Sequence, residues 1–378
     1  MEGAESVGAR AAGFVKGQVV LVVSAVLAVA SMILVPPSQE YVDYIDVRML
    51  CILFCFMAVV AGMRECHLFG AVAARLLAGR RSLRSLCLIL ILLPFFCSMF
   101  ITNDVALITF VPFTILVLGL AGEGRAILPV VVMQTVAANL GSMLLPFGNP
   151  QNLFIYSRYG VGTGEMVALL APYVVVGGIV MCLMCARFAT REVHVDISRD
   201  RDVRHRGFLA LMVVLFALCI LTVLRVLPWQ AVLAVTVLAI GLTHRRVLAR
   251  VDYGLLLTFV CLFVFTGNIS HIDAVSSALE GLMSWEPMLA SLGVSQVISN
   301  VPAATLLSGF ADDWQGLLVG VDVGGFGTPI ASMASMISLG FYSKLEGANT
   351  RRYLAWFTAA NVAMVAVLVA TYCVLNAL

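Results

Sequence analysis

Apolar runs long enough to cross a lipid bilayer recur from one end of this sequence to the other. The chain has 378 residues, of which 61% are hydrophobic and only 12% are charged, whereas about a quarter of the residues of a soluble domain are charged. We therefore expect an all-α polytopic membrane protein. The net charge of +2 gives no indication of a nucleic-acid partner, because the basic residues fall in the loops between the apolar runs.

The apolar runs are of two kinds. Nine are predicted to span the membrane as helices: 19–35, 47–63, 126–158, 165–187, 207–225, 228–244, 253–269, 313–343 and 352–376. Two others, 85–121 and 285–311, carry polar residues at their centres. As one helix, 85–121 would be about 55 Å long, against about 30 Å of hydrocarbon, and each arm of 285–311 is too short to span. Both are predicted to be re-entrant hairpins.

The positive charges predict an orientation. With a cytoplasmic N-terminus, 20 of the 23 Lys and Arg residues fall on the inner side, and only Arg48, Arg158 and Arg225 fall outside. Cytoplasmic loops of membrane proteins carry such an excess. We expect an inner-membrane protein whose N-terminus is cytoplasmic and whose C-terminus is outside. Hairpin 85–121 then enters from the cytoplasmic side and hairpin 285–311 from the outside.

The two halves of the chain share a pattern of motifs. The stretch "FCSMFITNDVALITF" (96–110) aligns with "GVSQVISNVPAATLL" (293–307), "FGNP" (147–150) aligns with "FGTP" (326–329), and 45–62 aligns with 251–268. Five predicted crossings separate equivalent points, so the second half is inverted in the membrane. We predict a first repeat over 1–190, a cytoplasmic linker over 191–206 and an inverted second repeat over 207–378. The first repeat contains the broken helix 126–158, and the second contains the broken helix 313–343.

Inverted repeats with broken helices are the architecture of secondary transporters, and non-helical backbone at membrane depth is tolerated only where protein or a cavity surrounds it. The polar residues of the tips and breaks are therefore candidates for a site. Hydroxyl, amide and carboxylate oxygens suit a hard cation such as Na⁺, and helix N-termini suit an anion. Helix capping alone is the weaker explanation for these residues. They are Thr102, Asn103, Asp104, Asn149, Ser299, Asn300 and Thr328.

Two buried acids stand out for coupling to a cation. Asp104 lies at the first tip, and Asp322 lies just before the second break, where Asn139 is its first-half counterpart. Ionisable residues at membrane depth usually mark ion or proton pathways. A structural role for Asp322, as a partner of hydroxyl groups, stays open. Cys182 and Cys185 have the spacing of a metal or redox motif, but they lie in a spanning helix and are interpreted as structural.

These motifs resemble the ion transporter superfamily that contains divalent-anion:sodium symporters, citrate permeases and arsenite permeases. The resemblance covers nearly the whole chain. It implies a homodimer with an elevator mechanism, and substrate contacts from Thr102, Asn103, Ser299 and Asn300. It also implies two cation sites completed by Ser98, Gly148, Ser295 and Gly327. The third tip position departs from the Ser-Asn-Thr of dicarboxylate symporters, because it is Asp104 in one tip and Val301 in the other.

The predicted function is therefore secondary active transport of a small anion, with a di- or tricarboxylate favoured, coupled to H⁺ or Na⁺. Metalloid efflux and Na⁺/H⁺ antiport on the same fold are the alternatives. An intramembrane aspartyl protease with Asp104 and Asp322 as its dyad is disfavoured, because these residues occupy non-equivalent repeat positions and the repeat would have no purpose. We expect no enzyme activity, no cofactor, no transition metal and no nucleic-acid partner.

Overall fold

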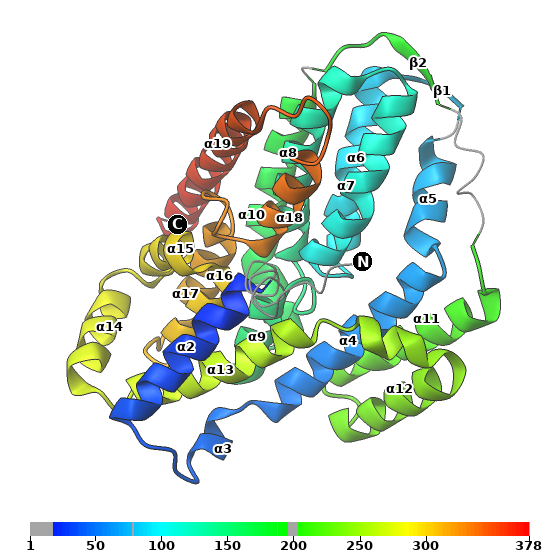
Figure 1. Cartoon of the computed structure of the whole chain (residues 1–378). Coiled ribbons are helices and arrows are strands. Elements are labelled where there is room, and N and C mark those ends of the chain that lie inside the picture. Colours follow the sequence, from blue (N-terminus) through cyan, green and yellow to red (C-terminus); the bar gives the residue numbers. More distant parts are fainter. Residues whose placement is uncertain (1–17, 78, 187, 196–202, 378) are drawn as a thin grey trace, which may run out of the picture.

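The computed structural model describes residues 18–77, 79–186, 188–195 and 203–377, and almost all of them lie in helices (Figure 1). The first half of the chain contains α2 (Val19–Leu34), α3 (Tyr41–Tyr44), α4 (Val47–Glu65), α5 (Leu68–Leu77), β1 (Gly79–Ser82), α6 (Leu83–Ser98), α7 (Asn103–Leu120), α8 (Gly124–Ser142), α9 (Pro150–Arg158) and α10 (Thr163–Cys185).

The second half contains β2 (Glu192–Val195), α11 (Arg206–Val223), α12 (Trp229–His244), the 3-10 helix η1 (Arg245–Arg250), α13 (Tyr253–Ile269), α14 (Asp273–Trp285), α15 (Pro287–Ile298), α16 (Asn300–Leu307), α17 (Trp314–Gly324), α18 (Met333–Tyr342) and α19 (Thr350–Asn376). β2 lies within the predicted linker 191–206 and pairs antiparallel with β1. Residues 196–202 of that linker lie outside the described residues.

The chain is a multi-pass membrane protein, as predicted. Seven of the described helices are long and apolar enough to cross a membrane, or eight if the bent pair α13–α14 is one span. The nine crossings, the inverted orientation of the second half and the placement of the termini stay predictions. The basic residues of the N-terminal segment 1–17, on which the orientation partly depends, lie outside the described residues.

Each interrupted run is a pair of helices joined at its polar centre. α6 and α7 are separated only by residues 99–102, and α15 and α16 meet at Ser299. The predicted broken helices are also divided: residues 143–149 separate α8 from α9, and residues 325–332 separate α17 from α18. The Gly and Pro residues of "FGNP" and "FGTP" lie in or beside these breaks, because neither residue favours a helix interior.

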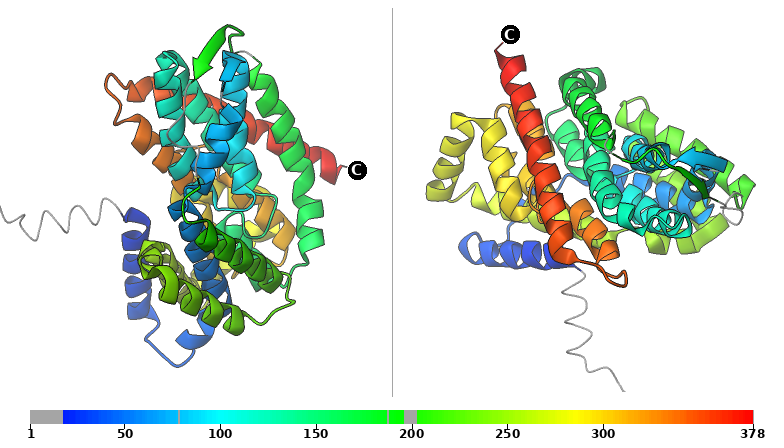
Figure 2. Two further views of the ribbon diagram at one scale, coloured as in Figure 1. Left: turned by 90° about the vertical axis from the view of Figure 1, so that its right-hand side faces the viewer. Right: turned by 90° about the horizontal axis from the view of Figure 1, so that it is seen from above.

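The helices pack in two groups. The framework bundle consists of α2, α4, α11, α12 and α13, in which α2 packs on α13 and both α11 and α12 pack on α4. The hairpin bundle consists of α6 to α10 and α15 to α19, in which α6 packs on α8 and α15 packs on α17. Figure 2 shows α2, α11 and α12 on one side of the molecule and α6 and α7 on the other. The main contacts between the bundles are those of α9 with α4 and of α16 with α13.

Candidate functional site

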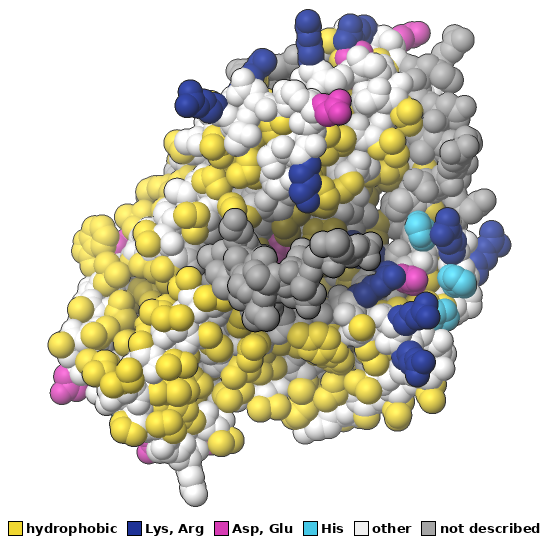
Figure 3. All heavy atoms as spheres, viewed as in Figure 1, with side chains coloured by type: hydrophobic (Ala, Val, Ile, Leu, Met, Phe, Trp, Pro, Cys, Tyr) yellow, Lys and Arg dark blue, Asp and Glu magenta, His cyan; other side chains and the backbone are white. Residues whose placement is uncertain are grey.

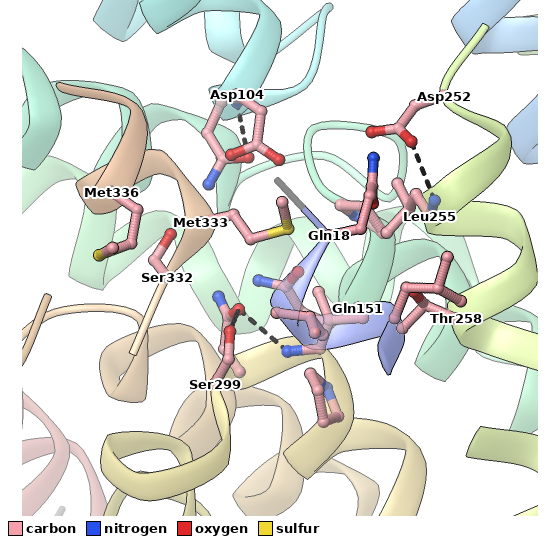
Figure 4. Close-up of a pocket in the computed structure, with 17 residues that line it drawn as sticks. Gln18, Asp104, Gln151, Asp252, Leu255, Thr258, Ser299, Ser332, Met333 and Met336 are labelled. Atoms are coloured by element: carbon pink, nitrogen blue, oxygen red, sulfur yellow. Dashed lines mark hydrogen bonds between the residues drawn. The ribbon is translucent and has the colours of Figure 1, made fainter. Parts of the chain in front are cut away.

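Both hairpin tips face one cavity, which we call the tip cavity (Figure 4). Its volume is about 160 Å³, below the roughly 300–1,000 Å³ of drug-sized ligand pockets, which favours a small solute. Figure 3 shows the molecule hollowed near the centre of one face. The polar residues of the lining come from both halves of the chain: Gln18, Asn103, Asp104, Gln151, Asp252, Thr258, Ser299, Asn300 and Ser332.

The first hairpin tip presents Asn103 and Asp104 to the cavity. Asn103 is the first residue of α7, and its Oδ1 accepts a hydrogen bond of 3.0 Å from the Asp104 N–H. Oδ1 of Asp104 is buried and has no hydrogen-bond partner among the described residues. Thr102 precedes the helix, but its side chain makes no capping bond and does not line the tip cavity. The tip therefore offers an amide and a carboxylate to a ligand rather than a hydroxyl.

The second tip is strained at Ser299. This residue has φ 75° and ψ 153°, a conformation that costs a non-glycine residue about 1–3 kcal/mol and persists only where the surroundings enforce it. The enforcing contacts come from the second break: the Asn300 N–H donates to the Ala331 carbonyl at 2.9 Å, and the Ser299 hydroxyl donates to the same carbonyl at 3.3 Å. Ser299 and Asn300 both line the tip cavity.

Asn139 joins the first tip to the second break. Its Oδ1 accepts hydrogen bonds from Asn103 Nδ2 at 2.9 Å and from the Ser332 hydroxyl at 3.3 Å, and its Nδ2 donates to the Gly325 carbonyl at 3.1 Å. Asn139 is only 4% exposed, and a buried amide that makes all these bonds holds its partners in one arrangement. Asn139 of α8 thus holds the first tip directly and joins it to the broken helix of the second half.

Asp322 of α17 contacts the first break through Asn149, and it is only 2% exposed. Its Oδ1 accepts hydrogen bonds from Asn149 Nδ2 at 3.3 Å and from Gln151 Nε2 at 3.2 Å. Its Oδ2 is buried with no hydrogen-bond partner among the described residues. A buried carboxylate with one free oxygen is very costly unless a proton or a cation occupies that oxygen. The geometry therefore fits the role in cation coupling that the sequence suggested for Asp322.

Gly148 and Gly327 have steric reasons to be glycine. A Cβ on Gly148 would lie 2.2 Å from the Ser142 carbonyl oxygen. Gly327 has φ +107°, and a Cβ there would lie 2.2 Å from Gln296 Oε1. Both breaks therefore need a residue without a side chain, whether or not their carbonyl groups also bind a cation.

Several predicted site residues lie outside the lining of the tip cavity, and Ser98, Ser295 and Thr328 bond elsewhere. The Ser98 hydroxyl donates to the Phe95 carbonyl, and the Ser295 hydroxyl donates to the Ser291 carbonyl, so each is bonded to its own helix. Thr328 is exposed, and its hydroxyl donates to the Gln296 carbonyl at 3.0 Å. Asn149 is also not in the lining, because it caps α9 and contacts Asp322 from behind.

Sequence reasoning missed five polar residues of the lining, one of which is Gln18 at the start of the described chain. Gln151 is the second residue of α9, after the first break, and Ser332 directly precedes α18, after the second break. Their positions beside the predicted breaks could therefore have marked both as site candidates. Asp252 aligns with Asp46 in the matched stretches 45–62 and 251–268. Thr258 had no signal, because a hydroxyl in an apolar helix usually bonds its own backbone, as its bond to the Gly254 carbonyl does.

The charge of the lining is acidic. Asp104 and Asp252 line the tip cavity, and none of the described residues in the lining is Lys or Arg. Two helix N-termini supply the positive ends of dipoles instead, since α7 begins at Asn103 and α16 begins at Asn300. An anion in this cavity would contact amides, hydroxyls and helix N-termini, and a cation or proton is needed to neutralise the acids.

Comparison with known proteins identifies a family and several relatives of this chain. Residues 12–340 match the sequence profile of the citrate transporter family. An uncharacterized transporter of Methanocaldococcus jannaschii is 31% identical over 83% of this chain and 85% of its own length. The inner membrane protein YbiR of Escherichia coli is 29% identical over 78% of this chain and 80% of its own length. An uncharacterized transporter of Mycobacterium tuberculosis is 24% identical over 85% of each chain.

The family match and the relatives named as transporters indicate that this helical multi-pass protein is a permease rather than an enzyme. This chain belongs to the citrate transporter family. The resemblance expected from the two tip motifs and the two breaks is thereby confirmed at the level of the family.

Proposed function

We propose that the chain is a secondary active transporter that moves a small di- or tricarboxylate together with H⁺ or Na⁺. The observation that carries this proposal is the convergence of both hairpin tips and two helix N-termini on one small cavity, next to a buried carboxylate with a free oxygen. The N-termini and the amides of Asn103 and Asn300 would bind the anion. Asp104 and Asp322 would bind the coupling proton or Na⁺.

The two bundles support alternating access of the elevator type. The tips, the breaks and both buried acids belong to the hairpin bundle, while Asp252 and Thr258 belong to the framework bundle. Movement of the hairpin bundle against the framework would carry the bound anion across the membrane with its ligands. A homodimer in the inner membrane, with a cytoplasmic N-terminus, is part of the proposal and is supported by the family resemblance and the charge pattern alone.

The acidic lining favours a second candidate. Because no described residue of the lining is basic, the cavity also suits a neutral metalloid such as arsenous acid, or a cation in Na⁺/H⁺ antiport. In either case Asp104 and Asp322 would serve without any bound anion.

Thermal unfolding of the purified protein with a panel of solutes distinguishes these functions. The panel contains citrate, succinate, fumarate, sulfate and arsenite, each with and without Na⁺ and at two pH values. A ligand at about a hundred times its Kd adds about 2.7 kcal/mol to the stability of the folded state. We expect one carboxylate to raise the melting temperature, and Na⁺ or low pH to increase the shift.

The variants Asn103→Ala and Asn300→Ala test the site. Each is expected to fold cooperatively and to lose the carboxylate-induced shift, together with uptake into proteoliposomes. Normal uptake by both variants would remove the site assignment. A shift with arsenite alone would favour metalloid efflux, and a response to Na⁺ and pH without any anion would favour antiport.

A further inference from the structure

A second cavity lies at the other end of the helices that line the tip cavity. Its volume is about 440 Å³. It is lined by the start of α4, the end of α9, the end of α13 and the end of α16, with Asp46, Ser157, Thr266 and Ser308 among its polar residues. α9, α13 and α16 therefore line both cavities in succession, one near their starts and the other near their ends.

Three phenylalanines pack together on α9 and α13, and two of them, Phe154 and Phe263, line the second cavity on the side toward the tip cavity residues of the same helices. Phe154 of α9 lies 6.3 Å from Phe259 and 5.6 Å from Phe263, both on α13, and the latter two rings are 5.9 Å apart, measured between centroids. All three are buried, with at most 5% of their surface exposed. Gln151 and Thr258 line the tip cavity, and Phe154 and Phe263, three and five positions further along the same helices, line the second cavity. That spacing places the two linings only about 4–8 Å apart along the helices.

Several hydrogen bonds join the bundles on this face, and one of them links two side chains at the end of α9 and the start of α4. The Ser157 hydroxyl, at the end of α9, donates to Asp46 Oδ2 at 2.8 Å. The other oxygen of Asp46 caps α4 by accepting from the Met49 N–H at 2.8 Å. α9 belongs to the hairpin bundle and α4 to the framework bundle. Ser157 can therefore hold the two bundles together on this face.

The aspartate that aligns with Asp46 is in the opposite situation. Asp252 caps α13 in the same way, by accepting from the Leu255 N–H at 2.9 Å. It is exposed and lines the open tip cavity (Figure 4), where the structure gives it no contact with a side-chain hydroxyl of the described hairpin bundle. Both aspartates cap a helix of the framework bundle. Asp46, at the closed face, also accepts a hydrogen bond from the hairpin bundle, whereas Asp252, at the open face, has no such bond among the described residues.

We propose that the second cavity is the vestibule for the transported anion on the face opposite the tip cavity's opening. Phe154, Phe259 and Phe263 close its passage, and the Ser157–Asp46 hydrogen bond holds that face shut. When the hairpin bundle moves, α9 withdraws Phe154 and Ser157 together, and the vestibule joins the tip cavity. This inference rests on the proposed function, and it identifies the route by which the anion reaches the tip cavity from the opposite face.

Removal of one phenylalanine tests the barrier without any carboxylate. The Phe263→Ala variant is reconstituted into liposomes that contain a pH-sensitive dye, and the proton leak is measured after a pH step. We expect a leak several-fold above that of the wild type, because both cavities then join in the state seen here. The control is Phe216→Ala, which removes a partly buried phenylalanine of α11 that packs on Phe56 and Phe147 and lines neither cavity. An unchanged leak in folded Phe263→Ala would overturn the barrier.

A cross-link tests the tie and does not depend on the fate of Phe263→Ala. Asp46→Cys and Ser157→Cys are combined and bridged with a short reducible bis-thiol reagent, and peptide masses verify the bridge. We expect bridged protein to lose citrate uptake, to keep the citrate-induced thermal shift and to regain uptake on reduction. The two single-cysteine variants, treated alike, are the controls. Full uptake by bridged protein would overturn the proposal.

The two assays also separate this inference from the proposed function. If wild-type protein neither binds nor transports any carboxylate, the proposed substrate is wrong, and the leak assay still decides whether the phenylalanines form the barrier. If the wild type transports citrate but neither the leak nor the cross-link has its expected effect, only the vestibule is wrong.

Discussion

At the scale of single residues, the acids of the site are the most informative feature. Asp322 and Asn139 occupy equivalent positions in the predicted repeat, and each is the centre of a hydrogen-bond cluster that includes residues of the other half. Asn139 is an amide that uses both its donor and its acceptor. Asp322 keeps a free oxygen. Asn139 therefore has a structural role, whereas the free oxygen of Asp322 could bind a proton or a cation.

The Asp322→Asn variant tests this difference. The amide has nearly the same shape, but it cannot take up a proton and binds Na⁺ poorly. Loss of a charge-assisted contact worth about 1.5–3 kcal/mol is expected to lower uptake by about ten-fold or more, and the remaining uptake should no longer respond to Na⁺ or pH. Uptake of radiolabelled citrate into proteoliposomes measures both effects. Asp312→Asn, at an exposed acid, is the control, and unchanged coupling in Asp322→Asn would refute the assignment.

Gly327 is a second residue with a defined steric role. The Gly327→Ala variant places a Cβ 2.2 Å from Gln296 Oε1 at φ +107°, so we expect it to destabilise the protein by about 1–3 kcal/mol. Gly340→Ala is the matched control, because Gly340 lies within α18 with open space around it, and alanine there should be neutral or stabilising. Thermal unfolding in detergent compares the two. Equal melting temperatures would show that the break relaxes around the added methyl group.

At the scale of elements, side-chain amides hold the broken helices. In the second break, Gln296 Nε2 donates to the Gly324 carbonyl at 2.8 Å and to the Phe326 carbonyl at 2.9 Å, while its Oε1 accepts from the Thr328 N–H at 2.9 Å. In the first break, Asn152 Nδ2 donates to the Met143 carbonyl at 2.8 Å. These bonds satisfy backbone groups that the broken helix leaves free.

The Gln296→Met variant removes these bonds and nearly preserves the volume of the side chain. It leaves the buried Gly324 and Phe326 carbonyls without this partner. A buried polar group without a partner costs about 1–3 kcal/mol. We expect a clear fall in melting temperature and a loss of the carboxylate-induced shift, since the break also positions the second tip. Gln315→Met, at an exposed position of α17, is the control. If both variants melt alike, the break does not depend on Gln296.

At the scale of the whole molecule, the structure is open on one face and closed on the other. The tip cavity opens between the start of α13 and the start of α18, where Met333 and Met336 line it. The opposite face is closed by the contacts of α9 with the framework bundle, which include the bond from the Tyr156 hydroxyl to the Val223 carbonyl at 2.7 Å. The predicted topology assigns the open face to the cytoplasm.

Labelling from each side of the membrane tests that assignment. The variants Met333→Cys and Thr266→Cys are treated in oriented vesicles with a membrane-impermeant thiol reagent, and peptide masses distinguish them from the ten native cysteines. In the state seen here, Met333→Cys should react only from the cytoplasmic side and Thr266→Cys only from the outside. The reverse pattern would show that the predicted orientation is inverted. Reaction of Met333→Cys from both sides would contradict a closed outer face.

Much of the architecture could be read from the sequence. The apolar runs predicted the long helices to within a few residues, because a bilayer imposes a length and a composition that few other constraints reproduce. They did not predict the helices α3, α5 and α14. The tip and break motifs predicted Asn103, Asp104, Ser299 and Asn300 as neighbours of one cavity, and all four line it. The family follows from the same motifs.

The sequence could not say which of these polar groups face the cavity and which only hold a helix. The sequence made Ser98 and Ser295 site candidates as well as Ser299, yet the hydroxyl groups of Ser98 and Ser295 donate to carbonyls of their own helices. That choice depends on side-chain rotation and on the neighbour across the packing interface, which no local pattern encodes.

What the sequence determined by itself is the membrane-spanning fold, the interruption of the spans and the presence of polar residues at those interruptions. These follow from hydrophobicity, from the backbone limits of Gly and Pro, and from the expense of placing an acid in lipid. Only the tertiary structure decided that Asn139 links the two halves, that Gln151 and Asp252 belong to the lining, and that Phe154 packs between Phe259 and Phe263. These contacts join helices far apart in the chain, and they exist only once the two bundles have packed.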